Sequence, residues 1–112
     1  MKNIASILIT DPISEAATAK LKREGFKVTV NELDPAGLLN SIKDFDVLIV
    51  RSRTKVTADL IQAGTKLKVI ARAGVGLDNI DVNAAKNRKI TVLNAAEAPS
   101  VSVAELVIGL ML

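Results

Sequence analysis

Short apolar runs alternate with segments of helical character along the whole chain, and this alternation constrains the fold more than any other feature. Each run is rich in Val, Ile and Leu and is bounded by polar residues, Gly or Pro, as expected of buried strands. The predicted strands are Ile4–Thr10, Phe26–Val30, Val47–Val50, Val69–Ala71 and Ile90–Leu93. Strands that alternate with helices at this spacing indicate βαβ units and therefore a parallel sheet with right-handed crossovers.

Capping residues mark the helices between these strands. Ser14 can cap a helix that runs through Glu24, and Gly25 stands where a helix C-terminal glycine belongs. Asp34 and Pro35 open a second helix, because Pro at the first helical position lacks only an N–H that would be unpaired anyway. Further helices are expected after the cap Thr57, over Asp81–Asn87, and from Ser102, which can form a capping box with Glu105.

The apolar patterns of two predicted strands indicate their places in the sheet. Phe26, Val28 and Val30 alternate with polar residues, which is typical of a half-exposed edge strand. Val47–Val50 is continuously apolar, which is typical of a central strand covered on both faces. We therefore expect an α/β fold, a flavodoxin-like three-layer αβα sandwich with a five-stranded parallel sheet in the order 2-1-3-4-5.

Composition excludes several classes of function. Among the 112 residues there is no Cys and no His, which excludes disulfides, thiolate chemistry, the commonest zinc ligands and histidine catalysis within this chain. Two Phe are the only aromatics and the net charge is only +3, which argues against a nucleic-acid partner. No apolar stretch is long enough to suggest a membrane span. Ser6 interrupts Ile4–Ile9 and Asp11-Pro12 soon ends it, so this run is interpreted as a first strand and not as a signal peptide, and a cytoplasmic protein is expected.

The carboxyl ends of three consecutive strands carry the candidate binding residues, and ligands of such sheets bind at this edge. The candidates are Arg51, Ser52, Arg72, Gly74, Val75, Gly76 and Asn94. The planar guanidinium of arginine matches carboxylate and phosphate oxygens, and glycines let the backbone approach an anion. The pattern predicts a cleft for a small anionic substrate, such as a carboxylate with a second negative group.

Simpler interpretations exist for each of these residues. Arg51 could be an exposed strand-end residue, and Arg72 could form a structural salt bridge with Asp78 or Asp81. The glycines could serve the turn alone, and Ser52 and Asn94 could stabilise turns. Two neighbouring cations are interpreted as solvated surface: Arg53 and Lys55.

The segment Gly74–Asn79 begins like the G-x-G-x-x-G fingerprint of dinucleotide-binding sites. Its third position is Asn79 instead of Gly, and no long helix follows it at once. We therefore interpret it as a substrate loop, and we expect no NAD site and no metal site in this chain.

Four blocks, Val50–Thr57, Arg72–Asp81, Asn94-Ala95 and Ser102–Leu106, resemble D-3-phosphoglycerate dehydrogenases of the D-isomer-specific 2-hydroxyacid dehydrogenase family. The resemblance implies that residues 1–98 form the family's substrate-binding domain, which a Rossmann domain that binds NAD follows. It also implies roles for the candidates. Arg51 and Arg72 would face the phosphate or carboxylate and Ser52 would position it, the backbone around Val75 and Gly76 would hold the carboxylate, and Asn94 would line the cleft near the hinge.

The sequence departs from that family in what it lacks. The fingerprint and the family's catalytic arginine, glutamate and histidine are absent, and Ala96–Ser100 replaces a glycine-rich hinge. We therefore expect a truncated substrate-binding domain that binds a small 2-hydroxy or 2-oxo acid weakly and does not catalyse a reaction alone. Residues 99–112 would be a helix that crosses toward the cofactor domain.

Two alternatives remain at this point. The chain could be a stand-alone or engineered scaffold without activity, whose apolar Ser102–Leu112 helix either docks on its own sheet or pairs between chains in a homodimer, possibly by swapping. A signalling receiver would need an acidic cluster at the first strand and an Asp after the third, but Asp11 has no acidic neighbour and position 51 is Arg.

Overall fold

A five-stranded parallel sheet forms the centre of the computed structural model, which describes residues 5–74, 76–95 and 101–111. The strands are β1 (Ser6–Ile9), β2 (Lys27–Val30), β3 (Val47–Val50), β4 (Val69–Ala73) and β5 (Thr91–Ala95). Their order is β2-β1-β3-β4-β5, which confirms the predicted topology. β4 and β5 run two residues further than expected, because Arg72 pairs with Asn94 and Ala73 with Ala95.

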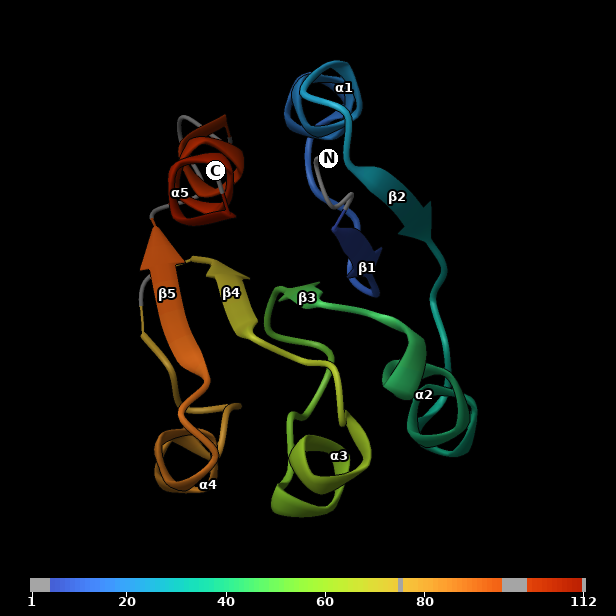
Figure 1. Ribbon diagram of the computed structural model, residues 1–112, viewed down its shortest axis with the longest axis vertical. Helices are drawn as coiled ribbons and strands as arrows, with labels where there is room; N and C mark the ends of the chain where they lie inside the picture. The colour runs from blue at the N-terminus through green and yellow to red at the C-terminus, as the bar shows by residue number, and fades with distance from the viewer. Residues whose placement is uncertain (1–4, 75, 96–100, 112) are drawn as a thin grey trace.

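Helices cover both faces of this sheet and complete the predicted three-layer sandwich (Figure 1). On one face lie α1 (Glu15–Arg23) and α5 (Val101–Met111). On the other face lie α2 (Pro35–Ser41), α3 (Ala58–Ala63) and α4 (Val82–Asn87), and a 3₁₀ turn, η1 (Ile42–Asp44), that the sequence pattern did not predict extends α2.

The predicted caps of the first helices are present. The Ser14 hydroxyl accepts a hydrogen bond from Ala17 N at 3.1 Å. At the other end of α1, Gly25 has a φ of +95° and its N–H donates to Lys22 O, while Phe26 N–H donates to Leu21 O. This is the Schellman arrangement, in which a left-handed residue satisfies the last carbonyls of a helix.

The sheet buries apolar side chains on both faces. The cluster beneath α1 and α5 includes Ile7, Ile9, Leu21, Val47, Ile49 and Val107. The cluster beneath the other helices includes Leu8, Leu48, Val50, Ile61, Ile70 and Ile90. All four residues of β3 are buried, whereas Val30 in β2 is 50% exposed, so the predicted central and edge strands are confirmed.

The last helix docks on the sheet of its own chain. Val103, Ala104 and Val107 are buried in the cluster that α1, β4 and β5 share. The opposite side of α5 is open, since Leu106 and Leu110 are 44% and 47% exposed. The helix begins at Val101, one residue before the predicted start, and the expected hinge at 96–100 and the side chain of Ser102 lie outside the described residues. No helix in the described part of the chain is long and apolar enough to cross a membrane.

Candidate anion-binding site

The sheet register brings the predicted strand ends to one edge. Val50 pairs with Arg72, and Arg72 pairs with Asn94, so β3, β4 and β5 reach the edge side by side. Because paired residues of parallel strands project to the same face, Arg72 and Asn94 share a face of the sheet. Asn94 is exposed, and Arg51 and Ser52, directly after β3, are exposed as well.

Arg72 is held in place with part of its hydrogen-bonding capacity unused. Its side chain is only 13% exposed, and Nη1 donates to Asp78 Oδ1 at 2.9 Å. This bond lowers the pKa of the Asp78 carboxyl group below its ordinary value, so Asp78 is ionised near neutral pH. The Arg72 Nε is buried and has no partner among the described residues. A buried donor of this kind is costly unless an acceptor reaches it.

Two glycines lie beside this guanidinium. A Cβ at Gly76 would lie 3.3 Å from Arg72 Nη1, and a Cβ at Gly74 would lie 3.7 Å from Nε. Gly76 also has a φ of +94°, which side chains other than glycine rarely adopt. Gly76 therefore serves both the turn and the close approach to Arg72, whereas a Cβ at Gly74 would make an ordinary van der Waals contact with Arg72. Val75 lies outside the described residues.

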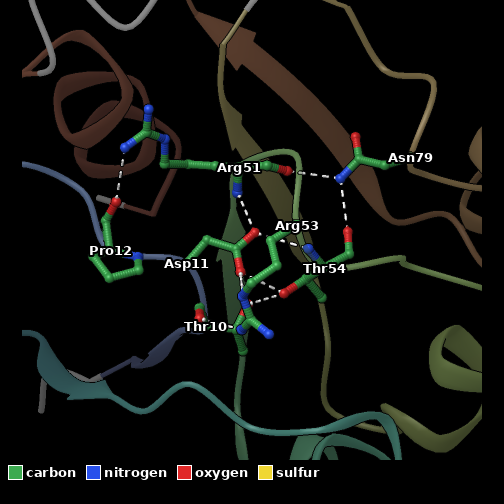
Figure 2. A network of polar contacts seen from close by, with 7 residues as sticks. All are labelled: Thr10, Asp11, Pro12, Arg51, Arg53, Thr54 and Asn79. Carbon is green, nitrogen blue, oxygen red and sulfur yellow. Dashed lines mark hydrogen bonds and ion pairs between the residues drawn. The ribbon is translucent and has the colours of Figure 1, made fainter.

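A buried carboxylate organises the loops at the same edge (Figure 2). Asp11, in the loop after β1, is 3% exposed. Its Oδ2 accepts hydrogen bonds from Arg51 N at 2.8 Å and Thr54 N at 3.0 Å. Its Oδ1 accepts from the Thr54 hydroxyl at 2.6 Å and pairs with Arg53 Nε at 3.0 Å.

The pKa of Asp11 reflects two opposing effects. Burial alone would raise the pKa, but the hydrogen bonds from Thr54 and Arg51, together with the charge of Arg53, outweigh burial and lower it below its ordinary value. Asp11 is therefore an anion near neutral pH, and Arg53 already pairs with it.

The side chain of Arg53 has a structural role that the sequence analysis missed. Besides its ion pair with Asp11, its Nη2 donates to Thr10 O at 2.8 Å (Figure 2). The side chain is 51% exposed, so the interpretation as solvated surface holds for only half of it. Lys55 is exposed, as expected.

Asn79 closes the network from a third loop. Its Nδ2 donates to Arg51 O and Thr54 O, both at 2.7 Å, and the residue is 6% exposed (Figure 2). Asn79 is the residue that breaks the dinucleotide fingerprint, and its amide explains why Gly would not serve there. The loops after β1, β3 and β4 are thus joined around the backbone of Arg51 and Thr54.

Arg51 presents its backbone and side chain to different partners. Its N–H and C=O are held by Asp11 and Asn79, and its Nη1 donates to Pro12 O at 3.3 Å (Figure 2). Arg72 turns instead to Asp78. The described residues include no cluster of three His, Cys, Asp or Glu side chains that could hold a metal ion. The guanidinium groups of Arg51 and Arg72 both lie at this edge, and such groups match carboxylate and phosphate oxygens.

Comparison with protein families identifies the family of the chain. Residues 7–108 match the D-isomer specific 2-hydroxyacid dehydrogenase family, in the region described as its catalytic domain. The chain belongs to this family. The resemblance seen in the sequence blocks is thereby confirmed, and a signalling receiver is no longer a candidate.

Similar proteins within the D-isomer specific 2-hydroxyacid dehydrogenases carry two different names. The chain is 54% identical over 109 residues to D-3-phosphoglycerate dehydrogenase of Methanocaldococcus jannaschii, covering 97% of this chain and 21% of that protein. It is 53% identical over 105 residues to hydroxypyruvate reductase of Thermotoga maritima, covering 93% of this chain and 34% of that protein. The chain therefore spans about a fifth to a third of the length of these relatives.

Solved structures show the same fold. The PH0520 protein of Pyrococcus horikoshii superposes with a TM-score of 0.80 at 29% identity, over 96% of this chain and 32% of that one. The 3-phosphoglycerate dehydrogenase of Entamoeba histolytica, solved with NAD⁺ bound, has a TM-score of 0.75 at 35% identity, over 97% of this chain and 38% of that one. This chain is thus a domain of a dehydrogenase family in which a member is seen with NAD⁺.

Proposed function

We propose that this domain binds a small anionic 2-hydroxy or 2-oxo acid, of the phosphoglycerate or hydroxypyruvate kind, at the carboxyl edge of its sheet. The observation that carries the proposal is the buried Nε of Arg72, which lacks a partner among the described residues beside two glycines. An incoming carboxylate or phosphate oxygen would supply the missing acceptor.

Each predicted residue has a role in this proposal. Arg72 and Arg51 pair with the phosphate or carboxylate, Ser52 orients it, and Asn94 lines the cleft. Backbone N–H groups around Val75 and Gly76 hold a carboxylate oxygen. Because these groups form one side of a cleft, we expect weak binding, with a Kd of about 1 mM, or roughly 4 kcal/mol.

We assign the redox reaction to a longer protein that contains this domain, and not to the domain alone. The relatives' names imply oxidation or reduction of such an acid, and one similar structure was solved with NAD⁺ bound. We expect this domain alone to be inactive. The segment Gly74–Asn79 does not fit a dinucleotide, because Asn79 is buried in the Asp11 network and the six-residue α4 begins only at Val82. The cytoplasm, which supplies NAD and phosphorylated acids, is the proposed location.

An NMR titration of the ¹⁵N-labelled chain tests the proposal. 3-Phosphoglycerate and hydroxypyruvate are added in turn, with NAD as the control ligand. Saturable shifts in the loops after Arg51 and Arg72, and in the Arg72 Nε–Hε signal, are expected with an acid and not with NAD. Arg72→Gln should weaken binding at least tenfold, whereas Arg23→Gln, at the exposed end of α1, should not change it. No shift with either acid at several millimolar would refute the proposed site.

Self-association through α5 is a second candidate role. Leu106 and Leu110 lie one helical turn apart and are both nearly half exposed, which leaves an apolar strip on the outer side of α5. We propose that a second copy of the chain, or the rest of the full-length protein, covers this strip. Sedimentation equilibrium at about 100 µM should show a dimer that Leu106→Ser weakens. Val30→Ser on the edge strand, which removes an equally exposed apolar residue, is the matched control. A monomer at that concentration would rule out a homodimer.

A further inference from the structure

A concave site lies between α2, α3 and the loop after β3. Its volume is about 270 Å³, near the lower end of the range for small-ligand pockets. The structure describes six of the seven residues predicted to bind the substrate anion, and none of these six lines it. It is therefore separate from the proposed anion site, although the loop after β3 contributes to both.

The walls of this pocket are apolar. Leu38 and Leu60, each 3% exposed, form part of the core and also line the pocket. Leu33 and Leu39 line it as well, and Leu39 is 40% exposed. Because an alkyl group that entered would remove such surface from water, the walls favour an apolar ligand body.

The rim of the same pocket is cationic. Lys55 and Arg53 line it, and both are exposed. Arg53 uses Nε for Asp11 and Nη2 for Thr10 O, and neither its Nη1 nor Lys55 Nζ has a hydrogen bond or ion pair among the described residues. Among the described residues, no acidic side chain lines the pocket. A ligand with one carboxylate at the end of an apolar body would match this distribution of charge.

We infer that this pocket binds a small amphipathic carboxylate, with its alkyl or ring portion against Leu38, Leu39 and Leu60 and its carboxylate at Lys55 and Arg53. The ligand differs from the proposed substrate, because a phosphorylated hydroxy acid has no apolar portion to bury. Since Arg53 contacts Asp11, which holds the backbone of Arg51, the ligand would touch the network that supports the anion site.

A homologous ligand series tests the inference. Leu methyl groups are labelled with ¹³C, and the chain is titrated with butanoate, hexanoate and octanoate at constant ionic strength. Saturable shifts are expected at the methyls of Leu38, Leu39 and Leu60, and affinity should rise about fourfold for each added methylene until the pocket is filled. Shifts centred on Leu106 and Leu110 instead would mean that α5 binds the alkyl chain, and would overturn the inference. So would a set of shifts without saturation.

Variants separate the two halves of the ligand. Lys55→Gln should weaken hexanoate binding about two- to fivefold and leave the weaker binding of hexanol unchanged. Leu39→Ser should weaken both ligands, and Lys43→Gln, on the exposed side of η1, should affect neither. Equal binding of hexanol and hexanoate would refute the carboxylate assignment. The outcome does not depend on whether 3-phosphoglycerate binds at the strand ends.

Discussion

Removal of the Asp11 carboxylate is predicted to be the most damaging single polar substitution at the carboxyl edge. Asp11→Ala leaves the N–H groups of Arg51 and Thr54 without their acceptor, and each unsatisfied donor costs about 1–3 kcal/mol. It also leaves the Thr54 hydroxyl without one of its partners. The ion pair adds little, because Arg53 is half exposed and water can solvate it. We expect a loss of about 3–5 kcal/mol in the free energy of unfolding.

Asp11→Asn should be less damaging, because one amide oxygen can still accept from the two backbone N–H groups. The expected loss in the free energy of unfolding is about 1–2 kcal/mol. It arises because Asn has no charge and no longer offers the second oxygen, which the Thr54 hydroxyl and Arg53 Nε both contact. The chain has no Trp and no Tyr, so urea unfolding is best followed by far-UV circular dichroism. Asp44→Ala, at an exposed aspartate of η1, is the matched control and should change stability by less than about 0.5 kcal/mol.

The pH dependence provides an independent check on the same carboxylate. The pKa of Asp11 is lowered in the folded chain, so the unfolded chain binds more protons as the pH falls from neutral through the ordinary value of 3.8. The stability that Asp11 contributes is therefore fully present above that value and is lost as the pH falls through the folded pKa. The difference in the free energy of unfolding between wild type and Asp11→Asn should accordingly become smaller at acidic pH. A loss below about 1 kcal/mol for Asp11→Ala at neutral pH would refute the role assigned to Asp11.

Three further substitutions test other parts of the structure by the same unfolding assay. Lys89, after the end of α4, has a left-handed φ of +59°, so Lys89→Gly should stabilise the chain by about 1 kcal/mol. The control Lys86→Gly, inside α4, should destabilise it by about 1 kcal/mol. Destabilisation by Lys89→Gly would contradict the left-handed conformation at this position. Asn79→Ala removes the donor to two carbonyls and should cost about 2 kcal/mol, and a neutral effect would mean that water replaces the amide. Ser14→Ala removes the N-terminal cap of α1 and should lower the free energy of unfolding by about 1 kcal/mol. An unchanged stability would mean that the first turn of α1 is already frayed.

The architecture could be predicted because its determinants are local. The continuous apolar run Val47–Val50 required a central strand, and Ser14, Gly25 and Pro35 marked helix ends through their own backbone preferences. Such signals depend on residues a few positions apart, so they can be interpreted without the fold. The position of the binding edge could be predicted from the parallel topology alone, because polar residues that follow parallel strands gather at the carboxyl ends of the sheet.

The partners of the polar side chains could not be predicted in this way. Asp11 and Thr54 are separated by 43 positions, and Asn79 and Arg51 by 28, so only the folded chain brings them into contact. No periodicity records such a pairing, because a single hydrogen bond leaves no repeat in the sequence. The interpretation of Arg53 as solvated surface was incomplete for this reason, although the position of Asp11 after the first strand was a usable signal.

The sequence by itself determined the layers, the strand order and the edge that carries the proposed binding residues, because hydrophobic periodicity and caps act over short distances. The tertiary structure alone decided that Asp11 is buried with its own cation, that Asn79 joins two loops, and that α5 covers its own sheet while leaving Leu106 and Leu110 open. Those outcomes depend on which surfaces contact each other in the folded chain, because that contact decides which polar groups are buried and which hydrogen-bond partners they find.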